Sequence, residues 1–250
     1  MTAGVVIPAR MASSRFPGKP LKKILGLTMI EHVWQRARMC PGIDRVVVAT
    51  CDQVILDECR RIGAEGVMTS DKHESCVDRV AEAARQLPVD VIINLQGDMP
   101  LVHPMCLSAL TAPFKDDRVL FTDMMGPIHD PQEELSANVV KVVASPTGDA
   151  LYYSREPLPS RRKVLSRIPV VRYKQLGINA YRKHTLELFA GLTRTPLETI
   201  ESVDMLRLLE SGYPVRMVVF DHPSVGVDTD EDLKRAENLM RADDSYKKYA

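Results

Sequence analysis

The sequence predicts an α/β fold built on a doubly wound, mostly parallel sheet. Short apolar runs rich in β-branched residues recur in the first hundred residues, at 5–7, 46–48, 66–68 and 89–94. Stretches with helical periodicity lie between them, around residues 29–39, 54–62 and 75–87. Continuous apolar strands that alternate with helices are typical of a parallel sheet covered on both faces. With 45% hydrophobic residues over 250 positions, the chain is able to bury the core that such a fold requires.

The second half of the chain departs from this alternation. Strand-like runs occur at residues 139–143, 151–153, 177–181 and 215–220, and helical patterns at 183–192 and 200–211. A last helix is expected after Thr229, which is placed to cap it, with Asp232 facing its first turn. Residues 155–174 are basic and contain prolines, which indicates an excursion from the sheet. We expect one domain over 1–250, with a small β-containing insertion over 125–182 and a frayed polar tail over 243–250.

Composition excludes several classes of protein. The formal net charge is zero and the pI is about 7.0, so no global field favours nucleic acid or a membrane surface as a partner. No apolar run is long enough to span a bilayer, and the N-terminus does not resemble a signal peptide. The five cysteines are odd in number and contain no CxxC pair, which argues against a disulfide framework and a zinc site. We expect a reduced, soluble, cytoplasmic protein.

A basic loop follows the first predicted strand. Residues 1–30 contain no Asp or Glu, but they contain Arg10, Arg15, Lys19, Lys22 and Lys23. Backbone N–H groups and guanidiniums on a loop of small residues are suited to binding a polyphosphate. The glycine spacing of a Walker A or dinucleotide-binding loop is absent. A solvated basic loop is the plain alternative, but ligands of such sheets bind beyond the carboxyl ends of the strands, and this position favours phosphate binding.

The loop from Pro8 to Leu21 resembles the nucleotide-binding signature of sugar-activating nucleotidyltransferases, and most of all that of the CMP-Kdo synthetase family. This family activates 3-deoxy-manno-octulosonate (Kdo) with CTP. The resemblance recurs in order along nearly the whole chain, at residues 48–50, 73–79, 94–100, 150–155, 176–182, 196–201 and 226–229. Several ordered motifs make a chance resemblance improbable. The resemblance implies a nucleotidyltransferase-type sheet and a homodimer, whose contacts we expect in the excursion over 155–174.

The implied reaction is the transfer of CMP from CTP to a small acidic acceptor, Kdo or a Kdo-like acid sugar, with release of pyrophosphate. An acceptor oxygen would attack the α-phosphorus in line, and positioning and electrostatics would supply most of the catalysis. The resemblance implies that the catalytic residues are Arg10, Arg15, Lys19 and Asp98. The implied nucleotide-binding residues are Pro8, Ala9, Arg10, Ser14, Arg15, Lys19, Thr50, His73, Ser75, Arg79 and Gln96.

Two aspartates are candidates for binding Mg²⁺. Asp98 follows an apolar strand within Gln-Gly-Asp, and Asp228 precedes a helix within Gly-Val-Asp. Magnesium prefers hard oxygen ligands, usually one or two carboxylates completed by phosphate oxygens and water. The resemblance implies that these two residues supply the carboxylates. The plain alternatives are a turn residue before Pro100 and a helix-start carboxylate favoured by the dipole.

The chain departs from the family pattern where the acceptor binds. Met99, Cys76, Val77, Gln175, Asn179, Ala180 and Thr199 stand where the family has Glu, Gly, Thr, His, Tyr, Gly and His. Loss of such polar groups alters substrate specificity strongly. A modified acid sugar or a small phosphonate therefore stays open as the acceptor. The candidate acceptor-binding residues are Gln96, Arg155, Gln175, Asn179, Glu198 and Glu201, with Arg161 and Arg162 nearby.

Three other functions fit parts of the pattern. A nucleotidyltransferase that uses UTP or ATP would need the same loop. A non-catalytic nucleotide-binding module would not need to retain Asp98 and Asp228. A dehydrogenase would need the glycine fingerprint that is missing.

Overall fold

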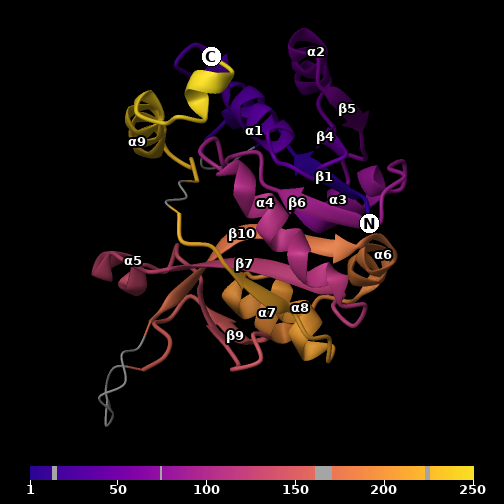
Figure 1. The fold of residues 1–250 in the computed structure, drawn as a ribbon, viewed down its shortest axis with the longest axis vertical. Coiled ribbons are helices and arrows are strands. Elements are labelled where there is room, and N and C mark those ends of the chain that lie inside the picture. The colour runs from indigo at the N-terminus through magenta and orange to yellow at the C-terminus, as the bar shows by residue number, and fades with distance from the viewer. Residues whose placement is uncertain (13–15, 74, 161–170, 223–225) are drawn as a thin grey trace.

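The computed structural model describes residues 1–12, 16–73, 75–160, 171–222 and 226–250. Within them, nine strands form one sheet at the centre of the molecule (Figure 1). Its main path has the order β11 (Arg216–Val219), β7 (Phe121–Pro127), β10 (Tyr173–Arg182), β6 (Val91–Leu95), β1 (Ala3–Pro8), β4 (Arg45–Thr50) and β5 (Glu65–Met68). All strands of this path except β10 run in the same direction. The predicted doubly wound, mostly parallel sheet is confirmed.

Helices cover both faces of the sheet, because successive side chains of each strand point to opposite sides. Val5 and Ile7 pack into one core and Val6 into the other. The first core lies under α1 (Met29–Arg38), α2 (Gln53–Ile62) and α4 (Pro104–Thr111). The second lies under α3 (Cys76–Ala84), α6 (Lys183–Gly191), α7 (Pro196–Glu201) and α8 (Met205–Glu210).

Smaller elements lie outside these layers. The strands β8 (Lys141–Ala144) and β9 (Ala150–Ser154) pair with each other, and β8 also pairs with the start of β10. The others are the hairpin of β2 (Lys23–Ile24) and β3 (Leu27–Thr28), the helices α5 (Pro131–Leu135) and α9 (Asp230–Arg241), and the 3₁₀ turns η1 (Lys19–Leu21), η2 (Ala112–Lys115) and η3 (Tyr246–Lys248). None of the helices that the structure describes is long and apolar enough to cross a membrane. The boundary of the predicted insertion at 125–182 stays a prediction, and residues 161–170 lie outside the described part.

The N-cap predicted for the last helix is present in the structure. Thr229 accepts a hydrogen bond at Oγ1 from the Asp232 amide at 3.1 Å, and its own hydroxyl donates to the Asp232 carboxylate at 2.8 Å. This is the predicted start of α9. The helix predicted over 200–211 is instead two helices. Ser202 between them has φ 53°, a left-handed conformation that ends α7.

The expectation of a frayed C-terminus is wrong. The tail packs on α1, where the buried Arg36 donates from Nε to the Tyr249 hydroxyl at 3.1 Å and pairs through Nη2 with Asp243 at 3.1 Å. His32 is also buried, and its Nδ1 lies 3.0 Å from the same hydroxyl. Two aromatic rings and a buried guanidinium therefore anchor a segment whose composition is largely polar.

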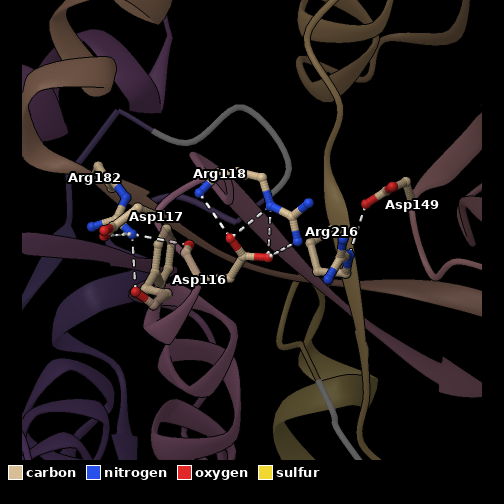
Figure 2. A network of polar contacts seen from close by, with 7 residues as sticks. Asp116, Asp117, Arg118, Asp149, Arg182 and Arg216 are labelled. Carbon is tan, nitrogen blue, oxygen red and sulfur yellow. Dashed lines mark hydrogen bonds and ion pairs between the residues drawn. The ribbon is translucent and has the colours of Figure 1, made fainter.

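Charged contacts hold the end of the sheet that lies opposite the carboxyl ends of the parallel strands (Figure 2). Arg182 at the end of β10 donates to the Asp116 carbonyl at 3.1 Å and to the Asp117 carboxylate at 3.2 Å. It also donates to the carbonyls of Phe114 and Val119, both at 2.9 Å. Arg216 at the start of β11 binds Asp149 at 2.7 Å. A cavity of about 960 Å³ lies beside Arg182 and contains none of the predicted site residues. The candidate site is at the other end.

Candidate functional site

The loops after β1, β4 and β6 meet at one rim of the sheet, as parallel strands require. The Met11 amide donates to the Asp52 carboxylate at 2.8 Å, which ties the loop after β1 to the end of β4. Gly97 lies so close to β1 that a Cβ there would be 2.9 Å from the carbonyl oxygen of Pro8. Only glycine permits this approach between the two loops.

Lys19 lies between the two predicted metal-binding aspartates. Its Nζ is 2.6 Å from Oδ2 of Asp98 and 2.9 Å from Oδ1 of Asp228. Gly18, with φ 70°, precedes the η1 turn that presents Lys19. The Val227 amide donates to the Asp98 carbonyl at 2.9 Å, which joins the segments that carry the two aspartates. The sequence predicted these three residues separately, and the structure brings them into one cluster.

The charge of this cluster follows from its geometry. Burial by itself lowers the pKa of Lys19, but the adjacent carboxylates of Asp98 and Asp228 outweigh it and raise the pKa above its ordinary value. Lys19 therefore stays protonated and balances part of the acidic charge.

The two carboxylates fit a hard cation such as Mg²⁺, because oxygens from both converge on one positively charged atom. Among the described residues, no group of three or more His, Cys, Asp or Glu side chains is placed to hold a metal. Two carboxylates completed by phosphate oxygens and water are the usual ligands of Mg²⁺ in nucleotide sites. The donor set is thus suited to an ion that arrives together with a phosphate ligand.

A pocket beside the first loop collects most of the predicted nucleotide-binding residues. We call it the loop pocket, and its lining residues are Pro8, Ala9, Arg10, His73, Ser75, Cys76 and Arg79. Ser75 caps α3, accepting from the Asp78 amide at 3.3 Å, and His73 binds the Glu82 carboxylate through Nε2. Thr50 is buried at the end of β4, where its hydroxyl accepts from the Asp52 amide at 3.1 Å. Ser14 and Arg15 lie outside the described residues.

Two arginines of the loop pocket differ in their surroundings. Arg79 is buried, and its Nη1 donates to the Thr69 hydroxyl at 2.5 Å and to the Ser70 carbonyl at 3.3 Å. Arg10 is exposed, and no hydrogen bond to another described residue occupies its guanidinium. Arg10 is therefore available to an anion, whereas Arg79 supports the wall.

A second cavity of about 580 Å³, here called the rim cavity, lies against the aspartates. Its lining residues are Gln96, Asp98, Met99, Glu133, Asn138, Val139, Val140, Lys174, Gln175, Leu176, Gly177, Gly226, Asp228, Thr229, Asp232 and Arg235. Lys174 is bound by Glu133, with both carboxylate oxygens at 2.6 Å. The predicted acceptor residues Gln96 and Gln175 line this cavity together with Asp98 and Asp228.

In three other residues predicted to bind the acceptor, the polar groups are already occupied by contacts within the fold. Arg155 donates to the carbonyls of Glu201, Ala137 and Ser202 at 2.6, 2.7 and 3.2 Å. Glu201 accepts from the Ser154 hydroxyl at 2.9 Å and from the Arg155 amide at 2.8 Å. Glu198 is buried and binds Arg207 at 2.5 and 2.8 Å. Arg161 and Arg162 lie outside the described residues.

Asp123 is a buried acid that the sequence gave no reason to select. It lies on β7, directly opposite the predicted acceptor residue Asn179 on β10, and Gln175 donates to its Oδ2 at 2.8 Å. Burial raises the pKa of Asp123 to about 7, although the nearby Tyr153 hydroxyl and the hydrogen bond from Gln175 act in the opposite direction. Its motif, Phe-Thr-Asp-Met-Met-Gly, has an interrupted apolar pattern, and this is the one signal that marked the position as unusual.

Comparison with known proteins identifies the class. Residues 4–241 match the model of a family described as Cytidylyltransferase, and the chain belongs to this family. It is 44% identical to the 3-deoxy-manno-octulosonate cytidylyltransferase of Syntrophotalea carbinolica, over 96% of this chain and 99% of that protein. The protein of the same name from Myxococcus xanthus is 43% identical over 95% of this chain and 96% of its own length.

A solved structure gives the same result. The structure of CMP:2-keto-3-deoxy-manno-octonic acid synthetase complexed with CTP superposes with a TM-score of 0.91 at 35% identity, and the alignment covers 97% of this chain and 99% of that one. The resemblance to the CMP-Kdo synthetase family is therefore confirmed. The protein is an enzyme, a nucleotidyltransferase of the cytidylyltransferase type.

Proposed function

We propose that the protein transfers CMP from CTP to Kdo, or to a closely related acid sugar, and releases pyrophosphate. The observation that supports this most directly is the convergence of Lys19, Asp98 and Asp228 at the wall of the rim cavity. In this proposal the cluster joins a triphosphate bound by the loop pocket to an acceptor bound in the rim cavity. The relatives named above act on 3-deoxy-manno-octulosonate.

The phosphate side of the site has three proposed functional groups. Arg10 and Lys19, with Arg15 from the undescribed part of the loop, would balance the charge of the triphosphate and of the leaving pyrophosphate. Before the nucleotide binds, Lys19 is held by the two aspartates. We propose that its ammonium turns to a phosphate oxygen when nucleotide and metal enter.

Asp98 and Asp228 would hold Mg²⁺, which, when bound, neutralises phosphate charge and polarises the reacting phosphoryl group. The chain's own contribution is to fix these two carboxylates on segments that are joined through the Val227 amide. Positioning at this accuracy is worth several orders of magnitude in rate.

The acceptor would occupy the rim cavity. Gln96 and Gln175 line it and are proposed to bind the acceptor directly. Asn179 is buried and does not line it, and its Oδ1 accepts from the Tyr181 hydroxyl at 2.6 Å. Arg155, Glu198 and Glu201 are proposed to support the wall, since the fold already occupies their polar groups.

The assembly and the compartment are further proposals. The family resemblance favours a homodimer, and size-exclusion chromatography with light scattering would measure its mass. All five cysteines are free thiols in the structure, which is in keeping with a reducing cytoplasm.

Pyrophosphate release with CTP and Mg²⁺ tests the proposed function. The acceptors are Kdo, its 8-amino analogue, neuraminic-type acids and small phosphonates, and UTP and ATP replace CTP in parallel. We expect turnover with CTP and Kdo. We also expect a loss of at least about 100-fold in Asp98→Asn and Asp228→Asn, but not in Asp230→Asn, an exposed residue of α9. Turnover confined to a phosphonate, or with UTP or ATP in place of CTP, would contradict the proposal.

A further inference from the structure

Three neighbouring strands carry a row of buried polar side chains beside the rim cavity. Asn94 on β6 is opposite Asn179 on β10, and Asn179 is opposite Asp123 on β7. Their exposed fractions are 1%, 4% and 0%. An apolar residue at position 123 would pack in this row without the free-energy cost of burying a carboxyl group. The presence of a carboxyl group in this row therefore calls for another reason.

The contacts of Asp123 fix the direction of each of its oxygens. Oδ1 accepts from the Met124 amide at 3.0 Å, and Oδ2 accepts from Nε2 of Gln175 at 2.8 Å. The neighbours of the carboxyl group on other elements are Tyr153 of β9 and Asp204 at the start of α8. No cation is in contact with it among the described residues.

Gln175 connects this buried acid to the rim cavity, which it lines together with Asp98 and Asp228. Oδ2 of Asp123 accepts from Nε2, so the amide nitrogen of Gln175 faces Asp123. The carbonyl oxygen Oε1 is then the end of the amide left for the cavity. Without such a partner, the two ends of a glutamine amide are nearly equivalent in size and are interchangeable.

We propose that Asp123 is a positioning residue that fixes the Gln175 amide, so that Gln175 offers its carbonyl oxygen to the acceptor and receives a hydrogen bond from one of its hydroxyl groups. The inference rests on the proposed function, because it requires a hydroxylated acceptor in the rim cavity. It makes Asp123 a determinant of acceptor specificity without contact with the acceptor. Sites built to bind a hydroxyl group reject ligands that cannot donate to them.

The substitution Asp123→Asn tests the direction of the Gln175 amide, because it replaces the hydrogen-bond acceptor that faces Gln175 with a donor. The Met124 amide still requires an oxygen at the Oδ1 position, so the new Nδ2 would face Gln175. Gln175 would then turn its carbonyl toward Nδ2 and present its NH₂ group to the cavity. A hydroxyl group that donates to Oε1 would have to reverse and accept from this NH₂ group, which leaves its own proton without that partner. We expect the KM for Kdo to rise about 10-fold with the KM for CTP unchanged within about twofold.

A second substitution, at Gln175, restores a hydrogen-bond acceptor to the cavity. In Asp123→Asn/Gln175→Glu, the new carboxylate accepts from Nδ2 on one side and offers an oxygen to the cavity on the other. We expect this double variant to recover most of the lost affinity for Kdo. A merely structural effect of Asp123→Asn predicts no such recovery and a change in the kinetics of CTP as well.

Gln175→Met provides a readout if Asp123→Asn folds poorly. It removes the amide and should raise the KM for Kdo to a similar extent, and adding Asp123→Asn to it should raise the KM no further. A KM for Kdo within twofold of wild type in Gln175→Met, or no recovery in the double variant, would overturn the inference.

Wild-type turnover with Kdo tests the proposed function separately. If another acid sugar is the acceptor, the same variants are measured with it, and an enzyme that uses only phosphonates would overturn both proposals.

Discussion

Lys19 is the residue on which the site depends most directly. Its ammonium contacts two carboxylates that come from distant parts of the chain, and their charge raises its pKa. A single cation in this position keeps Asp98 and Asp228 close together before any ligand enters.

Replacement of Lys19 by Met removes this cation and a proposed phosphate contact. We expect kcat/KM for CTP to fall at least about 100-fold, since charge stabilisation of this kind is commonly worth that much. Steady-state kinetics measures the effect, with Lys23→Met, an exposed lysine of β2, as the matched control. Equal losses in the two variants would mean that general positive charge matters and that the position of Lys19 does not.

Asp123 also makes a prediction about stability. Its pKa is about 7 in the folded protein, against 3.8 for an ordinary aspartate. The unfolded chain therefore releases this proton first as the pH rises, and the folded state loses stability between about pH 4 and pH 7. Relative to Asp123→Asn, the free energy of unfolding of the wild type should fall across this window by up to about 4 kcal/mol. Urea unfolding at several pH values measures it, and a constant difference between the two proteins would contradict it.

The positions of the two aspartates were largely predictable from the strands and the helix that carry them. Asp98 and Asp228 follow apolar strands or precede a helix with a clear cap, so their place at one rim follows from the alternation of strands and helices. β7 was not predicted, because Asp123 and Gly126 interrupt its apolar pattern. The direct contact of Lys19 with both aspartates was also not predictable, since pairs separated by 79 and 209 positions are set by the packing of whole elements.

The loop after β6 makes a prediction at the same scale. In Gly97→Ala, the Cβ would lie 2.9 Å from the Pro8 carbonyl, closer than real Cβ atoms approach backbone oxygen. The loops after β1 and β6 would separate, and we expect kcat/KM to fall about 10- to 100-fold because small displacements in a site have large effects on rate. Gly191→Ala at the end of α6 meets open space and is the control. Wild-type kinetics in Gly97→Ala would show that the close approach is dispensable.

At the scale of the whole molecule, the C-terminal segment that follows α9 packs on α1. Arg36 is fully buried, and Asp243 supplies its compensating charge. Removal of one partner of a buried ion pair leaves the other uncompensated, which typically costs about 3–5 kcal/mol. The tail thus behaves as part of the core, although its sequence is mostly polar.

The substitution Asp243→Ala should therefore lower the free energy of unfolding by about 3 kcal/mol, or somewhat less because Asp243 is partly exposed. Asp244→Ala removes the neighbouring exposed carboxylate and is the matched control. Urea denaturation followed by circular dichroism distinguishes them. Equal stabilities would mean that the tail adds nothing to the fold.

The coupling of CMP to an acid sugar is tested most directly by ³¹P NMR of the purified enzyme with CTP, Mg²⁺ and Kdo. We predict that the three resonances of CTP are replaced by one phosphodiester resonance and by pyrophosphate in equal amounts, with neither change when Kdo is left out. Unchanged CTP in the presence of Kdo, or the appearance of CMP without a phosphodiester, would contradict transfer of CMP to this acceptor.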